Sequence, residues 1–504
     1  MAWTLFISAI ALLALGVPVA FALAAAALLA VALDDQYSAI VVLKEMFTGI
    51  DSFPLLAVPF FILAAELMTG GKLTEVLLRF ASQFVGHRRG GLGHANVLSL
   101  TFFSGISGSA LADAAGPGSM MIRMMDKAGY SKAYAAALTA STAVVGPIIP
   151  PSIIMIIYAL QDDRVSAGAL FMAGLLPGLL IAVAMMIVNQ IVSTRRHYRA
   201  DALRPSAREM VRNTINAIPA LLLPVIILGG IRAGIFTPTE ASVVAVVYAL
   251  LCGAFIYRSL HWKNVPTILS RSAILTASVL LIVAASAAFA WVLTIENVPQ
   301  SLARWITALE VGPITLLLLI NVLLLIFGIF IEPLPGVMVL VPILAPVAHA
   351  AGIDPVHFAM IVIYNLTLGM ITPPVGGLLA VTSAVSKVPI GALVRELRPF
   401  LIAHLIVLVI VTLVPALSTW LPYSSGLAKP WRAIVNSSEA ARGVREWVFA
   451  DDGADAGVAQ RHMARVTDSG RCLYVRRAQK KQSLRLTTTS GFNISVLMVT
   501  IRSA

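Results

Sequence analysis

Apolar runs long enough to cross a lipid bilayer recur along most of this chain, and no other feature restricts its fold as strongly. A spanning helix needs about 20 apolar residues, and only helices or closed barrels satisfy their backbone hydrogen bonds in lipid. The runs are continuous rather than alternating, so we predict an all-α polytopic membrane protein. The candidate segments are approximately residues 4–33, 53–69, 97–121, 133–160, 168–192, 216–232, 239–257, 272–295, 314–349, 358–383 and 400–422.

Charge is sparse and unevenly placed. Only 12% of the residues are charged, against about 25% in a typical soluble domain. The formal charge of +12 could suggest nucleic acid, but Arg and Lys lie mainly in short loops between apolar runs, as the positive-inside rule expects. The expected partner is therefore the lipid bilayer and not nucleic acid. Cys252 and Cys472 provide neither a disulfide framework nor a metal-ligand spacing.

The basic loops set a topology with two re-entrant hairpins. Loops around 72–89 and 195–212 are both basic and are expected on the cytoplasmic side, yet three apolar segments lie between them. Segment 97–121 resolves the conflict if it enters and returns, because it is rich in glycine and is followed by Arg123, Lys127 and Lys132. Segment 314–349 is too long for one helix and is split by Glu332-Pro333-Leu334-Pro335-Gly336. We predict that it is a hairpin from the opposite face.

An internal repeat relates the two halves. Pro117-Gly118, Ala128-Gly129 and Pro150-Pro151 are followed in the same order by Pro335-Gly336, Ala351-Gly352 and Pro373-Pro374. The distance from Ala128 to Ala351 and from Pro150 to Pro373 is 223 positions in each case. Two like units of opposite orientation are typical of secondary transporters.

The repeat divides the chain into three parts. Residues 1–212 form the predicted first inverted repeat, with hairpin 97–121 and broken helix 133–160, and residues 213–425 form the second, with hairpin 314–349 and broken helix 358–383. Residues 426–504 are a basic tail, predicted to be disordered and dispensable. Segment 4–33 carries Gly16 and Pro18 and is either one tilted helix or a broken pair.

The first hairpin tip offers oxygen atoms in an apolar setting. Ser107-Gly108-Ser109 combines hydroxyl groups with backbone that can approach other backbone closely, which suits a hard cation; the alternative is tight helix packing alone. Asp113 is costly in a membrane and should face a cavity or a partner. Glu332 roughly mirrors it. Either carboxylate could be a cation ligand or could only hold its hairpin to a neighbouring helix.

The broken helices offer backbone N–H groups. Gly146, Pro147 and Pro150-Pro151 interrupt the first, and proline suits the first position of the next half-helix, which predicts that helix resumes at Pro151. Gly369 and Thr372-Pro373-Pro374 interrupt the second, with Thr372 expected as N-cap. The freed N–H groups and helix dipoles suit a carboxylate. The alternative is a proline kink that serves packing only.

Other polar residues have plainer interpretations. Thr237-Pro238-Thr239-Glu240 is a predicted capping box, and Glu66 and His404 are expected to pair or to snorkel.

No Arg or Lys lies in either helix break or hairpin tip. A bound anion would therefore need helix dipoles and a bound cation to neutralise it, and the anion and the cation should bind cooperatively. There is no G-x-x-x-x-G-K-[ST] phosphate loop, so transport would be driven by a gradient.

Four motifs together resemble the large membrane subunit of the tripartite ATP-independent periplasmic (TRAP) transporters. They are Ser107–Asp113, Gly146–Ser152, Thr237–Ala241 and Thr372–Gly376. The resemblance covers about residues 1–425. It implies an elevator-type, sodium-driven symporter that imports a C4-dicarboxylate or related organic acid across the bacterial inner membrane. It also implies a separate small TRAP membrane subunit and a periplasmic substrate-binding protein.

The resemblance also implies where ligands bind. Sodium would lie between each hairpin tip and the neighbouring helix break, with substrate between the two sites; no other cofactor and no catalytic residue is expected. The candidate sodium ligands are Ser107, Ser109, Asp113, Ser141, Thr142, Gly146, Glu332, Gly336, Asn365, Thr367, Gly369 and Thr372. The candidate substrate-binding residues are Ser107, Gly108, Ser109, Pro147, Pro150, Ser152, Thr372 and Pro373.

Two other functions fit parts of the sequence. A stand-alone symporter or antiporter of the same architecture would need no binding protein, and a neighbouring reading frame for a secreted binding protein would argue against it. A polytopic membrane enzyme could use Asp113 and Glu332 as acid and base, but no cluster of His or other metal-ligand residues accompanies these two carboxylates in the spans.

Overall fold

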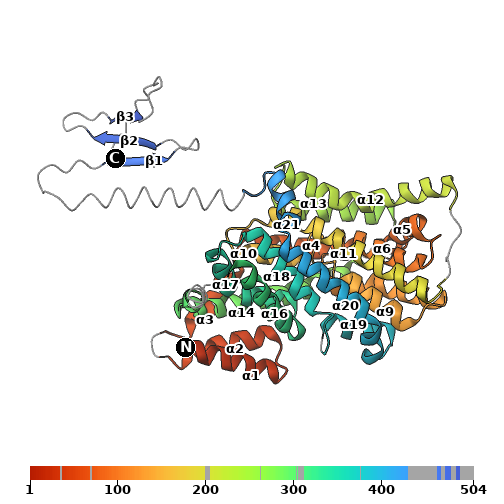
Figure 1. Ribbon diagram of the computed structural model, residues 1–504, viewed down its shortest axis with the longest axis horizontal. Helices are drawn as coiled ribbons and strands as arrows, with labels where there is room; N and C mark the ends of the chain where they lie inside the picture. The colour runs from red at the N-terminus through yellow and green to blue at the C-terminus, as the bar shows by residue number, and fades with distance from the viewer. Residues whose placement is uncertain are drawn as a thin grey trace, which may run out of the picture. The chain divides into compact units, whose positions relative to one another are not determined.

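The computed structural model describes residues 1–429, apart from 35–36, 69–70, 199–204, 262, 302–303, 305–311 and 375, and three strands farther along the chain. The chain divides into two compact units, Met1–Ala428 and Lys429–Ala504. The described part of the first unit is helical (Figure 1).

The helices follow the apolar runs. Those of the first half are α1 (Ala2–Ala14), α2 (Val19–Ala32), α3 (Ile40–Ile50), η1 (Phe53–Leu56), α4 (Ala57–Met68), α5 (Gly71–Val85), α6 (Gly91–Ser107), α7 (Ala110–Asp113), η2 (Ala114–Gly118), α8 (Ser119–Lys127), α9 (Lys132–Ala143), α10 (Ile153–Gln161) and α11 (Ala167–Arg195). Those of the second half are α12 (Ala207–Arg232), α13 (Pro238–Leu251), η3 (Cys252–Ile256), α14 (Val265–Ile295), α16 (Pro313–Phe330), α17 (Pro333–Ala350), α18 (Pro355–Gly369), α19 (Gly377–Ser386), α20 (Ile390–Leu413) and α21 (Ala416–Ser424).

Within the described residues, 7 helices are long and apolar enough to cross a membrane: α11, α12, α13 with η3, α14, α16, α17 and α20. Several of them expose rows of large apolar side chains. Val183, Ile187 and Ile191 on α11 are about half exposed. Such rows would be unfavourable in water and are expected against lipid. The prediction of an all-helical polytopic membrane protein is therefore confirmed for this unit.

The N-terminal segment is a broken pair, which settles the alternative left open by the sequence. α1 ends before Gly16, which has a φ of 80°, and α2 begins after Pro18. The two helices lie side by side (Figure 1). α2 and α3 pack on α14, and α4 packs on α13. The predicted capping box at the start of α13 is present, with Thr237 and Glu240 bonded reciprocally.

The second unit contains three described strands, β1 (His462–Val466), β2 (Cys472–Arg477) and β3 (Leu484–Thr488). They form an antiparallel sheet in the order β1-β2-β3, with His462 opposite Arg476 and Leu473 opposite Thr488. These strands lie within the tail 426–504, for which disorder was predicted. The other residues of the tail beyond 429 lie outside the described residues.

Candidate functional site

The first helix break spans residues 144–152, between α9 and α10. α10 begins at Ile153 with Ser152 as its N-cap; the Ser152 hydroxyl accepts from Met155 N (3.4 Å) and donates to Pro147 O (2.6 Å). The prediction that helix resumes at Pro151 is therefore wrong. The physical reason is that a serine hydroxyl satisfies a free N–H of the first turn, which proline cannot do.

The second break spans residues 370–376, between α18 and α19. Thr372 is not the N-cap that the sequence suggested. Its hydroxyl donates back to Leu368 O (3.0 Å) and its N–H to Gly369 O (3.0 Å), so tight turns extend the end of α18 as far as this residue. The N-cap of α19 is Gly376. The peptide bond within the Pro-Pro pair is cis in both breaks.

The first hairpin turns at Gly108, whose φ is 61°. α6 ends at Ser107, Ser109 is the N-cap of α7, and the limb formed by α7, η2 and α8 returns against α6. Asp113 on this limb is fully buried, and its carboxylate accepts hydrogen bonds from Ser104 (2.9 Å) and Ser107 on α6. Asp113 therefore braces the two limbs of its own hairpin.

The second hairpin turns at residues 331–332, between α16 and α17. The predicted split over Glu332–Gly336 is too long, because Pro333 takes the first helical position, where proline is well accepted, and helix continues through Gly336. Glu332 is the N-cap of α17. Ser109 is likewise the N-cap of α7, directly after the first turn, so by its place in the hairpin Glu332 mirrors Ser109 rather than Asp113.

Each hairpin tip packs against the helix break of its own half. A Cβ on Gly108 would lie 2.5 Å from Pro151 O, and one on Gly146 would lie 2.9 Å from Ala110 N and from Asp113 Oδ2. In the second half, Gly328 lies against Gly369. The structure thus brings together the candidate residues at 107–113 with those at 146–152, and the second hairpin with the break that follows Gly369.

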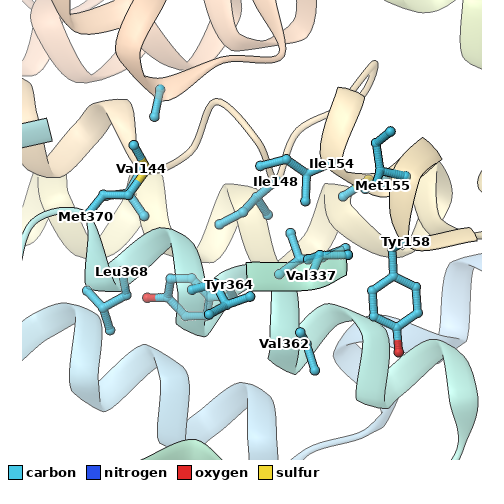
Figure 2. Close-up of a cluster of buried hydrophobic side chains, with 14 of the residues drawn as sticks. Val144, Ile148, Ile154, Met155, Tyr158, Val337, Val362, Tyr364, Leu368 and Met370 are labelled. Carbon is cyan, nitrogen blue, oxygen red and sulfur yellow. The ribbon is translucent and has the colours of Figure 1, made fainter. Parts of the chain in front are cut away.

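The two halves are joined by contacts that cross between the repeats. α10 packs against α17, and α19 packs against α7, η2 and α8. Figure 2 shows buried apolar side chains of the first break and α10 gathered with those of α17, α18 and the second break. The labelled members are Val144, Ile148, Ile154, Met155, Tyr158, Val337, Val362, Tyr364, Leu368 and Met370. This apolar layer holds the two breaks in one packed core.

The candidate ligand oxygens before the breaks differ in their availability. The hydroxyls of Ser141, Thr142 and Thr367 each donate to a carbonyl four residues earlier, which leaves their lone pairs free. Asn365 is fully buried and donates from Nδ2 to Asn321 O (2.9 Å) and Oδ1 (2.7 Å), while its own Oδ1 has no hydrogen-bond partner in the described part of the chain. An open, buried oxygen atom is what a cation ligand requires.

Sequence reasoning missed two residues that support these sites. Ser104 binds the Asp113 carboxylate, and Asn321 positions the side chain of Asn365. Asn321 is the one amide side chain in the apolar run 313–330, so the cost of a strongly polar side chain in a membrane was a signal that could have found it. Ser104 gave no comparable signal among the small residues around it.

The chain is similar in sequence to a known family of transporter subunits. Residues 6–417 match the family described as "Tripartite ATP-independent periplasmic transporter, DctM component". The chain is 43% identical over 411 residues to the sialic acid TRAP transporter large permease protein SiaM of Vibrio cholerae, covering 82% of this chain and 96% of that protein. It is also 43% identical to the C4-dicarboxylate TRAP transporter large permease protein DctM of Pseudomonas aeruginosa, covering 76% and 90%.

A solved structure shows a related fold. The YdaH transporter of Alcanivorax borkumensis matches with a TM-score of 0.55 and 17% sequence identity, covering 76% of this chain and 88% of that one. At this identity the match concerns the fold alone.

Proposed function

Because the chain belongs to the DctM family of tripartite ATP-independent periplasmic transporters, we propose that it is the permease subunit of a sodium-driven importer of a small carboxylate. The chain is a multi-pass membrane protein of a transporter family. The enzyme alternative is therefore excluded, since the relatives are transporter permease proteins. Relatives named for sialic acid and for C4-dicarboxylates support a carboxylate as the substrate class.

The observation that carries the sodium proposal is the open Oδ1 of Asn365 beside the second break. Neither hairpin tip nor break contributes an Arg or Lys side chain to neutralise an anion. A cation bound at each break, together with the N–H groups at the starts of α10 and α19, would supply the positive charge that a carboxylate needs. Sodium and substrate then bind cooperatively, because each lowers the electrostatic cost of the other.

We further propose that the hairpins are re-entrant and that the hairpins and broken helices of both halves move together, as an elevator, against a scaffold formed by the other helices. The support is the apolar layer of Figure 2, which packs the two breaks into one body, and the packing of α2, α3 and α4 on α13 and α14. The basic loops around 72–89 and 195–212 would then lie in the cytoplasm of a bacterium, with the chain in the inner membrane.

The proposed partners are a small membrane subunit and a periplasmic substrate-binding protein. The family description supports them, because it names a tripartite, periplasmic system of which this chain matches one component. A stand-alone symporter remains the second candidate function. Uptake without any binding protein would favour it.

The test is uptake into proteoliposomes that contain this chain, the co-encoded membrane subunit and the co-encoded binding protein. Labelled succinate would probe for a C4-dicarboxylate and labelled sialic acid for the other named substrate class. We expect uptake of one probe that requires both an inward sodium gradient and the binding protein. Uptake of the same size in choline or potassium would overturn sodium coupling.

A further inference from the structure

One buried histidine contacts both broken helices. His404 on α20 is fully buried; its Nε2 lies 3.0 Å from Ser141 O on α9, and its Nδ1 lies 3.0 Å from the Tyr364 hydroxyl on α18. Tyr364 is also fully buried. The side chain therefore links an element of the first repeat to an element of the second.

The two contacted positions are equivalent in the repeat. Ser141 and Tyr364 are 223 positions apart, the same offset that relates Gly146 to Gly369. Each precedes its glycine by five positions. His404 itself has no such counterpart, because the equivalent position holds the buried Ile181. A single side chain thus joins matching points beside the two breaks.

The hydrogen bonds fix the ring. A carbonyl can only accept, so Nε2 must carry the hydrogen that is donated to Ser141 O. In the neutral ring Nδ1 is then an acceptor, and it shares the single hydrogen of the Tyr364 hydroxyl with His404 O, to which that hydroxyl also donates. The same hydroxyl lies 3.0 Å from His404 O, which places Tyr364 against both the side chain and the backbone of this residue. Each ring nitrogen therefore has a hydrogen-bond contact, one to each repeat.

We infer that His404 is a positioning residue that couples the two breaks. It holds α9 and α18 at matching points beside the two proposed cation sites, so that a change in helix geometry at one break is transmitted to the other. This inference rests on the proposed function where it concerns sodium. The mechanical link between the breaks can be tested without transport.

The first test is hydrogen exchange on the purified chain without sodium. His404→Leu removes both links, Tyr364→Phe removes one, and His404→Gln retains a donor and an acceptor. The control is His357→Leu, since His357 is also buried and makes two hydrogen bonds, to Ser418 Oγ (2.9 Å) and Thr412 O (3.2 Å), both within the second half.

We expect exchange at both residues 144–152 and residues 370–376 to rise about tenfold in His404→Leu, the change typical of one lost buried hydrogen bond. Tyr364→Phe should show a smaller rise at both breaks, and His404→Gln a rate close to that of the original chain. The control should leave residues 144–152 unchanged. A rise confined to one break, or an equal rise at 144–152 in the control, would overturn the inference.

The second test is the sodium dependence of uptake. If two sodium sites communicate through His404, His404→Leu should lower the Hill coefficient toward unity, and His404→Gln should restore it. A loss of rate with an unchanged Hill coefficient would mean a merely structural role. If uptake by the original chain needs no sodium, the proposed function fails, while the exchange experiment still decides whether His404 links the breaks. If His404→Leu does not fold, Tyr364→Phe is used for both the exchange and the uptake measurement.

Discussion

Gly328 of α16 and Gly369 of α18 lie with their backbones in contact, at the point where the second hairpin meets the second helix break. A Cβ on Gly328 would lie 3.2 Å from Gly369 Cα, and a Cβ on Gly369 would overlap the backbone of Gly328. The approach of the two helices therefore depends on the absence of side chains at both positions. It is also the contact that ties the hairpin to the break.

Gly369→Ala should separate α16 from α18. We expect a destabilisation of about 1–3 kcal/mol, the usual effect of overpacking a core, together with loss of uptake. Thermal unfolding in detergent and the proteoliposome assay would measure the two effects. The control is Gly229→Ala in α12, where a Cβ would meet nothing within 4 Å; if both variants behave alike, the contact does not matter.

Ser107→Ala should weaken the first hairpin. It removes one of the two hydroxyl donors to the buried Asp113 carboxylate, and a hydrogen bond to a charged group contributes about 1.5–3 kcal/mol. We expect a lower midpoint of thermal unfolding. Ser119→Ala, which loses only a bond to Gly116 O at an exposed position, should change the midpoint little. Equal midpoints for both variants would contradict the brace.

Asn365→Ala should raise the sodium concentration needed for half-maximal uptake. Removal of the open Oδ1 of Asn365 is expected to raise it about tenfold, which corresponds to about 1.4 kcal/mol. Asn189→Ala is the control, because Asn189 is equally buried but its oxygen accepts from Tyr134 (2.8 Å) and Ser193 (3.3 Å). An unchanged sodium requirement in Asn365→Ala would remove this residue from the cation site.

Arg196→Ala should loosen the contact between the end of α11 and α20. The guanidinium donates two hydrogen bonds to Glu396 (2.7 and 3.2 Å) and lies 5.4 Å from the centre of the Tyr134 ring; these bonds to the carboxylate raise the pKa of Arg196. We expect a loss of about 0.5–1 kcal/mol, since the pair is partly exposed. Arg79→Ala, which breaks a more exposed pair with Glu75, should cost less. Unfolding midpoints would compare them.

Deletion of residues 430–504 should leave uptake intact. The family match ends at residue 417, and every contact that forms the two candidate sites lies within Met1–Ala428. The truncated and full chains would be compared at equal amounts in proteoliposomes. Loss of uptake by a stably folded truncated chain would show that the tail has a role.

The sequence predicted those features that have a local cause. Glycine and proline break helices through their own geometry, so the breaks after Ala143 and Gly369 and the turn at Gly108 could be found without a structure. The capping box of α13 is likewise determined by four consecutive residues. The offset of 223 positions between the Ala-Gly and Pro-Pro pairs of the two halves can be read from the sequence by counting residues.

Features that depend on packing could not be found in this way. Which residue caps a half-helix depends on where the helix resumes, and this is why Pro151 and Thr372 were wrongly placed. His404 could be recognised as a polar residue in need of a partner. Its actual partners depend on how α9, α18 and α20 pack, and that information is spread over three distant segments.

The caps of the two hairpins have a consequence for the likeness of the two halves. Ser109 and Glu332 are both N-caps of the helix that follows a hairpin turn, yet one ends in a hydroxyl and the other in a carboxyl group. The two hairpins thus share the place of the cap but not its polar group. The two turns are therefore not interchangeable, because exchanging their cap residues would place a carboxyl group where the first half has a hydroxyl and a hydroxyl where the second has a carboxyl group.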